Sequence, residues 1–585
     1  MTDMRRTLLW VVFATSLFLL WDAWQKDHGH PSLFSGMGEQ PAATATAPAG
    51  MPLTSGAQGT ASVPGTTAGA AATALPAAAS PMAEQVSVTT DLVKATFSSI
   101  GGTLVRLELL KQKEEQHEPW YQPIIELFGA AKMVHADSNV VLFDHTAQHI
   151  YVAESGLVNV PAPITHLTPM QVLPGARALA AGDNELRISF AATEGGVTLV
   201  KTYVLHRGRY AIDVQQQVSN LGAAALPAPE IYLQLKRDGE AGPGGAGFSH
   251  TFTGPALYTE NNKFKKIEFK DIDKNKAEFD HSADYGWVAM VQHYFASAWI
   301  HNAPGPRKFD VTASDAAHNG LGMRVYNINM SFALPALAPG ASENFDAVLF
   351  AGPQEERKLA ELATGLEYVK DYGWFMPLAK PLFWLLVHLH GFLGNWGFSI
   401  IALVVILKAV FFWLNASAYK SMAKMKAINP KVMEMRERLK DKPQQMQQEM
   451  MRIYREEKVN PLGGCLPIVV QMPFFIALYW VLLSSVEMRN APWVGWVHDL
   501  SAPDPFFILP LLMTLSSLFQ VWLNPTPADP MQAKMMWIMP LVFSVMFFVF
   551  PAGLVLYWLT NNILSIAQQW YINNRLGVQK PLRVT

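Results

Sequence analysis

The sequence predicts a multi-domain membrane protein that combines six transmembrane α-helices with one all-β domain. Of the 585 residues, 50% are hydrophobic and only 16% are charged, whereas about a quarter is charged in ordinary soluble domains. Several long runs contain no charged residue and suit a hydrocarbon layer about 30 Å thick. Between the first two runs lies a long segment with alternating apolar and polar residues, which is the pattern of half-buried strands.

The apolar runs give the number of spans. They cover residues 7–21, 391–407, 459–486, 505–528 and 535–574. Because about 20 residues suffice for one crossing, the last run is long enough for two, and Pro551-Ala552-Gly553 marks a turn near its middle. The sequence therefore predicts one span near the N-terminus and five near the C-terminus.

Residues 1–24 form the first predicted span, and residues 25–84 form a linker. Arg5 and Arg6 precede the apolar run, as in a cleaved signal peptide, but Trp21–Trp24 offers no cleavage site with small residues, which favours an uncleaved anchor. Ala, Pro, Gly and Thr dominate the linker. Such a segment cannot bury enough apolar surface to fold, so we expect a flexible tether.

Residues 85–350 are predicted to form a two-sheet β-sandwich. Tyr210–Ser219 alternates apolar and polar residues, with Gln216 out of the pattern. Gly101-Gly102 predicts a hairpin turn. Further strands are expected at 93–97, 103–109, 199–205, 230–235, 323–328 and 345–350. About 260 residues are enough to build a core between two sheets.

Residues 351–393 connect this domain to the second span. Pro353–Lys370 has a charged helical pattern, and Lys380–His390 has the pattern of an amphipathic helix that lies on the outer membrane surface. The alternative is that Lys380–His390 extends the second span. The three glycines between 391 and 397 favour a break between the two.

The segments between the spans set the orientation. Arg5 and Arg6 precede the first span, residues 419–458 carry eleven lysines and arginines, and the tail at 573–585 carries three. Residues 487–504 carry only Arg489. The positive-inside rule then places both termini in the cytoplasm and the β domain on the opposite side of the membrane.

One lysine lies in the middle of the second predicted span, Gly397–Asn415. Lys408 is 11 residues after Gly397 and 12 before Lys420, which places it about 16 Å from either end of the hydrocarbon layer. An ammonium exposed to lipid at that depth would cost about 3 kcal/mol. We therefore expect Lys408 to face a water-filled cavity and to mark a functional site. The alternative is that a local water defect tolerates it.

Residues 394–572 contain the five later spans and a predicted cytoplasmic helical hairpin at 416–458. An apolar stripe at helical spacing follows its first arm and resumes after a break at Lys440–Pro443. The stripe consists of Met422, Met425, Ile428, Val432, Met435 and Leu439, and then of Met446, Met450, Ile453 and Tyr454. Such a stripe is typical of packing between two helices, and its flexible methionines also suit transient contact with apolar substrates. The basic outer face suits anionic lipid, ribosomal RNA or a targeting factor.

Polar residues in the later spans are candidates for lining one hydrophilic cavity with Lys408. They are Gln471 in the third span, Thr514, Ser516, Ser517 and Gln520 in the fourth, and Tyr557, Thr560, Asn561, Asn562 and Gln568 in the sixth. The alternative is that each hydrogen-bonds a neighbouring helix, a contact worth about 0.6 kcal/mol. The set as a whole, together with a buried lysine, favours the cavity. The sequence predicts no enzyme activity, no cofactor and no metal site.

Eight short stretches of the sequence are the most distinctive. They are Gly394–Ile401, Ser421–Lys426, Met435–Leu439, Lys458–Cys465, Gln471–Pro473, His498–Ser501, Asp529–Gln532 and Gly553–Tyr557. Together they resemble the YidC/Oxa/Alb family of membrane-protein insertases, and the resemblance covers nearly the whole chain. It implies a five-helix insertase core with a groove open to the cytoplasm and to lipid. It also implies a periplasmic β-supersandwich domain in a protein of the bacterial inner membrane.

The resemblance also implies partners and a site. Family members accept nascent inner-membrane proteins, alone or with the SecYEG translocon, and receive them from the ribosome and the signal recognition particle. The family usually has arginine at the position of Lys408, and a neighbouring position that can carry threonine is Val404 here. The charge is retained, but the bidentate geometry of a guanidinium is not.

The residues suit an insertion mechanism in which Lys408 attracts the acidic flank of a nascent segment. A wet groove shortens the path of that flank across the hydrocarbon layer. Apolar walls let the segment slide into lipid, and partition into lipid supplies the driving force without nucleotide. The predicted wall residues are Met472, Pro473, Phe474, Phe547 and Phe550.

Two other classes of protein share some of these features. A secondary transporter also buries a lysine in a helical bundle, but it usually has an internal repeat with matching broken helices, and the sequence offers none. An envelope enzyme that acts on glycans would need a cleft with paired carboxylates in the β domain, which a sequence does not reveal.

Overall fold

A computed structural model describes residues 84–114, 138–146, 148–239, 252–314, 323–440, 442–457, 466–524 and 530–575. The predicted N-terminal span, nearly all of the linker and most of the tail lie outside these residues. The first residues of the third predicted span, 459–465, also lie outside them.

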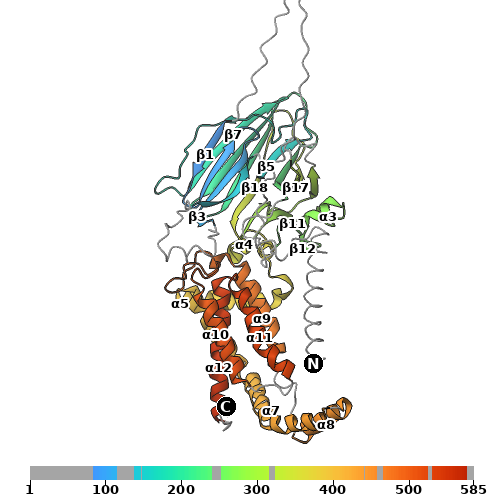
Figure 1. The fold of residues 1–585 in the computed structure, drawn as a ribbon. Helices are drawn as coiled ribbons and strands as arrows, with labels where there is room; N and C mark the ends of the chain where they lie inside the picture. Colours follow the sequence, from blue (N-terminus) through green and yellow to red (C-terminus); the bar gives the residue numbers. More distant parts are fainter. Residues whose placement is uncertain are drawn as a thin grey trace, which may run out of the picture. The chain divides into compact units, whose positions relative to one another are not determined.

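The described residues between 85 and 353 form a sandwich of two nine-stranded sheets (Figure 1). The strands of the first sheet, in spatial order, are β1 (Gln85–Thr89), β2 (Val93–Ser98), β3 (Thr103–Lys113), β4 (Asn139–His145), β5 (Ile150–Val158), β10 (Glu230–Asp238), β17 (Val325–Ala333), β16 (Arg307–Ser314) and β13 (Ser282–Ala283). Those of the second sheet are β12 (Lys263–Lys266), β11 (Gly254–Thr259), β14 (Gly286–Val291), β15 (Phe295–Ile300), β18 (Ser342–Pro353), β9 (Ala211–Asn220), β8 (Val197–His206), β7 (Glu185–Glu194) and β6 (Gln171–Val172). Neighbouring strands run antiparallel, and one short helix, α3 (Phe269–Asp273), joins β12 to β13.

The core of this domain lies between the two sheets. Phe97 of the first sheet packs on Phe190 and Tyr203 of the second, with ring centroids 5.8 and 4.7 Å apart. All three rings are buried in one hydrophobic cluster. The predicted β-sandwich is therefore confirmed, and the strands expected from the alternating pattern are present.

Two local predictions can be compared with the strands that contain them. Gly101 and Gly102 form the turn between β2 and β3 with φ of +70° and +56°, as predicted, and a Cβ at Gly101 would overlap the backbone of His166. Gln216 does not interrupt the alternation of β9, because it faces the core between the buried Val214 and Val218. Its side-chain amide is buried without a hydrogen-bond partner among the described residues.

A buried lysine connects the two sheets. The Nζ atom of Lys201 on β8 donates to the carbonyl oxygens of Gly101, 2.8 Å away, and of Ser155 on β5, 2.6 Å away. The side chain is fully enclosed, and this burial lowers the pKa of the Lys201 ammonium to about 7. The contact fixes the glycine turn of the first sheet onto a strand of the second.

The described elements between residues 356 and 575 are all helices. The helices are α4 (Glu356–Leu362), the 3-10 helices η1 (Leu366–Val369) and η2 (Gly373–Phe375), α5 (Met376–Leu393), α6 (Trp396–Val410), α7 (Phe412–Arg438), α8 (Pro443–Glu456), α9 (Leu466–Ser484), the 3-10 helix η4 (Val486–Met488), α10 (Ile508–Leu523), α11 (Pro530–Phe547) and α12 (Ala552–Arg575). The last helix contacts α6, α7, α9 and α10, so it occupies the centre of the helical region.

Two predicted breaks are present. Gly394, with φ of +66°, ends α5 before Asn395 caps α6, so the amphipathic segment is a separate helix and does not extend the next one. The long apolar run near the C-terminus divides into α11 and α12 around Pro551.

The prediction of one continuous helix at 397–415 is wrong. Phe411 leaves the helical conformation at φ −88° and ψ 9°, and α6 and α7 meet there at 66°. Its ring packs edge-on against Phe474 of α9, 5.0 Å away between centroids, and this contact fixes the bend. Taken singly, no described helix is both long and apolar enough to cross a membrane, whereas α6 and the first part of α7 meet those criteria as a bent pair. The predicted count of six spans is not confirmed.

The helical hairpin has the predicted arms and the predicted break. α7 and α8 contact each other, and Lys431 of α7 pairs with Glu457 just after α8, at 2.6 Å. Ile428, Val432 and Met435 of the apolar stripe are buried. Met433, which lies outside the stripe, is exposed.

Candidate functional site

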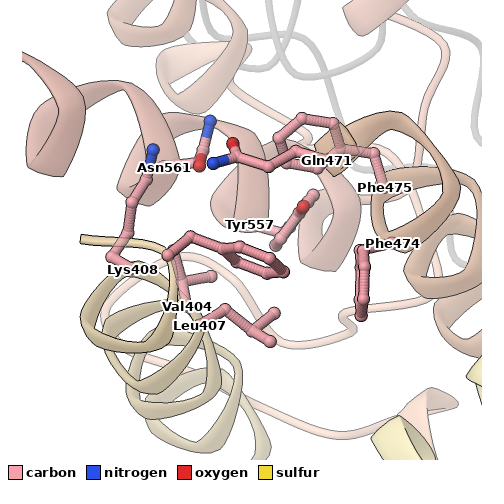
Figure 2. Close-up of a pocket in the computed structure, with 9 residues that line it drawn as sticks. Val404, Leu407, Lys408, Gln471, Phe474, Phe475, Tyr557 and Asn561 are labelled. Atoms are coloured by element: carbon pink, nitrogen blue, oxygen red, sulfur yellow. The ribbon is translucent and has the colours of Figure 1, made fainter. Parts of the chain in front are cut away.

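A pocket lies where α6, α9 and α12 meet (Figure 2). Its walls are Val404, Leu407, Lys408 and Phe411 from α6 and its bend, Gln471, Phe474 and Phe475 from α9, and Tyr557 and Asn561 from α12. Figure 2 shows the polar ends of Lys408, Asn561 and Gln471 along one side and Val404, Leu407 and Phe474 along another. The pocket therefore places one cation, two amides and a phenol beside an apolar wall.

The ammonium of Lys408 has a polar partner on α12. Its Nζ donates to the hydroxyl of Ser565 at 2.7 Å. No carboxylate within the described ranges lies at ion-pair distance from it. A cation held between helices without a counter-ion favours the approach of an anionic group.

A second polar contact connects three helices beside the pocket. Gln471 of α9 donates to the side-chain oxygen of Asn415 on α7 at 2.8 Å, and Asn415 donates weakly to Gln568 on α12 at 3.4 Å. Both Asn415 and Gln471 are buried. The bend at Phe411 precedes Asn415 by one helical turn, so it determines the direction in which α7 presents this amide.

The structure brings Lys408 and three of the ten other predicted polar residues to one pocket, and the remaining seven do not line it. Lys408, Gln471, Tyr557 and Asn561 line it. Asn562 instead donates to Ser517 of α10 at 2.9 Å, which is a helix-to-helix contact outside the pocket. Gln520 of α10 is not among the lining residues either. The alternative interpretation, a hydrogen bond to a neighbouring helix, therefore describes Asn562 and Ser517.

Only one of the five predicted apolar wall residues lines the pocket. Phe474 lines the pocket, and Met472, 49% exposed, lies on the outside of α9 with the half-buried Pro473 after it. Phe547 and Phe550 are buried in the core of the helical region, with their ring centroids 6.1 Å apart. They do not line the pocket.

Two residues of the site, Ser565 and Asn415, escaped sequence reasoning. Ser565 is four residues after Asn561 and so lies on the same face of α12, and Asn415 is seven residues, about two turns, after Lys408. Spacing from Asn561 was therefore a usable signal for Ser565, whereas the bend at Phe411 lies between Lys408 and Asn415 and makes their spacing uninformative. A serine or asparagine in a helix is so often bonded to its own backbone that neither suggests a site by itself.

One cluster in the β domain bears on the glycan-enzyme alternative. The buried carboxylate of Glu154 accepts from Lys236 at 2.8 Å and from Gln234 at 2.9 Å, and His166 is 3.7 Å from it. Both carboxylate oxygens are thus already engaged. The cluster has the character of a structural ion pair between β5 and β10.

Comparisons with known proteins cover both halves of the chain. A family model described as YidC periplasmic domain matches residues 85–385, and one described as 60Kd inner membrane protein matches residues 388–579. The chain is 53% identical over 582 residues to the membrane protein insertase YidC of Cupriavidus necator and 51% identical over 579 residues to that of Ralstonia nicotianae, with 99% of each chain covered in both cases.

A crystal structure of an active YidC insertase with its first transmembrane domain resolved is 17% identical, with a TM-score of 0.37, and the match covers 83% of this chain and 92% of that one. The assignment depends on the family models and on the full-length relatives. On their evidence, the chain belongs to the YidC/Oxa/Alb family.

Proposed function

We propose that this chain inserts nascent membrane proteins into the inner membrane, and that the pocket at Lys408 receives the polar flank of the arriving segment. The observation that carries the proposal is an ammonium in a pocket between helices, with a hydroxyl as its hydrogen-bond partner and no carboxylate paired with it in the described part of the chain. An acidic side chain of a substrate would complete the missing ion pair.

The residues that line the pocket suit transient binding of a polar substrate flank. A carboxylate beside Lys408 gains a charge-assisted hydrogen bond, and Gln471 and Asn561 offer amide donors and acceptors for the peptide groups that flank it. Because these partners replace water, a polar flank is stabilised part of the way across a hydrocarbon layer about 30 Å thick. Amide contacts alone are weak enough to allow release.

The apolar residues of α9 provide the exit toward lipid in this proposal. Phe474 lines the pocket, and Met472 and Pro473 continue the apolar surface outward. A hydrophobic segment gains free energy when it moves from water into lipid, so insertion needs no nucleotide hydrolysis. Phe547 and Phe550, buried in the core of the helical region, contribute by packing and not by contact with the segment.

The setting of the pocket follows from the family resemblance and from the charge pattern. We place both termini in the cytoplasm and the β domain in the periplasm of a multi-pass protein, with the groove open to the cytoplasm and to lipid. The basic hairpin α7–α8, with its methionines, would meet cargo delivered by the ribosome and the signal recognition particle. The chain would act alone or together with the SecYEG translocon.

Reconstitution of the purified full chain in liposomes tests the proposal. The substrate is a small single-span protein with a short acidic translocated tail, and protection of that tail from protease is scored without nucleotide or another translocase. We expect insertion by the wild type and a loss of roughly tenfold in K408M, the size of effect expected when a charge-assisted contact of about 1.5 kcal/mol is removed.

The matched control is K534M, because Lys534 is an exposed lysine of α11 outside the pocket. Equal insertion by wild type, K408M and K534M would show that the charge of Lys408 does not contribute to insertion. No insertion by folded wild-type protein would contradict autonomous insertion.

A further inference from the structure

The side chain that holds the pocket cation belongs to Ser565. This serine is 5% exposed and lies on α12, where its hydroxyl oxygen is 2.7 Å from Nζ of Lys408. Its backbone carbonyl also accepts, at 3.4 Å, from the hydroxyl of Tyr419 on α7. Ser565 therefore connects three helices, α6, α7 and α12, at the edge of the pocket.

The direction of the serine hydrogen bond is fixed by a second contact. The hydroxyl of Ser565 donates its single hydrogen to the backbone carbonyl of Asn561, 2.7 Å away. A hydroxyl has one hydrogen to donate and two lone pairs that accept. Because the hydrogen is already committed, the oxygen faces Lys408 purely as an acceptor, which is the polarity that an ammonium requires.

The ammonium needs such an anchor more than a guanidinium would. Lysine carries its charge as a point at the end of a flexible four-carbon stem, whereas the planar fork of arginine is preorganised. One of the three N–H donors of Lys408 is used by Ser565, which leaves two for a ligand in the pocket. A fixed ammonium loses less conformational freedom on binding than a free one, so it binds an anion more tightly.

We propose that Ser565 is a positioning residue of the insertase: it holds the Lys408 ammonium at the edge of the pocket so that the charge meets an acidic substrate flank in one place. This inference rests on the proposed role of Lys408. It assigns no substrate contact to Ser565 itself, which acts through the lysine.

The test compares two substrates in the liposome assay with the full chain. One substrate carries an acidic translocated tail, and the other carries the same tail with each Asp and Glu replaced by Asn and Gln. The variants are S565A, S565T, K408M and the double variant K408M/S565A. The control is S544A, because Ser544 is also a buried serine that donates to its own helix, to the carbonyl of Leu541, but it is remote from the pocket.

We expect S565A to lower insertion of the acidic tail about three- to tenfold, the effect of losing one ordinary intramolecular hydrogen bond, and to change the neutral tail less than twofold. S565T keeps the hydroxyl and should restore the acidic-tail rate, and S544A should affect both tails alike. In the K408M background, S565A should have no further effect, since a residue that acts through Lys408 is silent without it.

Three results would overturn the proposal. The first is that K408M lowers the ratio of acidic-tail insertion to neutral-tail insertion, whereas S565A leaves this ratio unchanged. That result would contradict the role of Ser565 and leave the role of Lys408 intact. The second is an equal loss from S565A in the wild-type and K408M backgrounds, which marks a purely structural serine. The third is an unchanged ratio in K408M, which contradicts the proposed function itself. If S565A does not fold, the comparison of S565T with the wild type decides, because a threonine hydroxyl at this position must preserve the ratio.

Discussion

The indole ring of Trp493 lies against the backbone of Gly397, the second residue of α6, so that a methyl group on this glycine would overlap the ring. The contact is held from the other side by Asn395. Its amide nitrogen donates to the carbonyl oxygens of Pro492 and Trp493 at 3.1 and 3.2 Å, while its oxygen accepts from the amide of Phe398 at 3.1 Å. One asparagine thus caps α6 and fixes the loop before α10 over a residue that has no side chain.

Replacement of Gly397 by alanine should destabilise the helical region. The added methyl forces the partly buried Trp493 ring to move, and overpacking of this kind typically costs about 1–3 kcal/mol. The midpoint of thermal unfolding in detergent measures the effect. G391A is the control, because a Cβ at Gly391 meets nothing within 4 Å and alanine is the better helix former. Equal midpoints for the two variants would contradict the packing argument.

The stability of the β domain should rise with pH above neutrality because of Lys201. Its pKa is lowered from 10.5 to about 7 by burial, so the unfolded chain binds the proton more tightly than the folded chain between these values. The free energy of unfolding therefore increases from about pH 7 toward pH 10, by up to about 1.4 kcal/mol per unit, and the contribution is constant below pH 7.

Urea unfolding of the full chain in detergent, followed by hydrogen exchange of peptides from β8 with the labelling pulse at one fixed pH, measures this slope. K201M has no group to titrate at this position and should show a flatter profile, so the difference between the two proteins isolates Lys201 from other titrating groups. A slope that is the same in both proteins would refute the assignment.

The hairpin offers a comparison between two adjacent residues. Val432 is 2% exposed between α7 and α8, whereas Met433 is 54% exposed on the outer face. V432D should separate the two arms, because a buried unpaired carboxylate costs several kcal/mol. M433D should leave the hairpin folded, and it should lower insertion only if exposed methionines contact the substrate. Limited proteolysis measures folding of the hairpin, and the liposome assay measures insertion. Protease resistance of V432D equal to that of M433D would contradict a packed hairpin.

Where a signal is local, the sequence predicted the structure. Gly394 ends α5 through its left-handed backbone, and Pro551 and Pro443 lie at the starts of α12 and α8, where a proline favours the break before a helix. The bend at Phe411 has no such signal, because Ala409-Val410-Phe411-Phe412 contains neither proline nor glycine. It depends on a ring of another helix, Phe474, and a contact of that kind is absent from any local pattern.

The site was predictable to a similar extent. A lysine within an apolar helix is conspicuous because placing a charge there is costly, and Lys408 does line a pocket between helices. The sequence does not show which neutral polar residues line the pocket, because Asn561 and Asn562 are adjacent in sequence yet face different helices. Only the rotation of α12 about its axis decides which of them reaches Lys408, and that rotation is set by packing against α6 and α10.

Phe411 is both the point at which α6 gives way to α7 and a wall of the pocket. The hairpin begins on one side of this residue and Lys408 lies on the other. Any rotation of α7 about the bend therefore moves the Phe411 ring and changes the space beside the cation. The hairpin and the pocket are in this sense mechanically coupled through one shared residue, so a change in the angle between α6 and α7 is also a change in the volume beside Lys408.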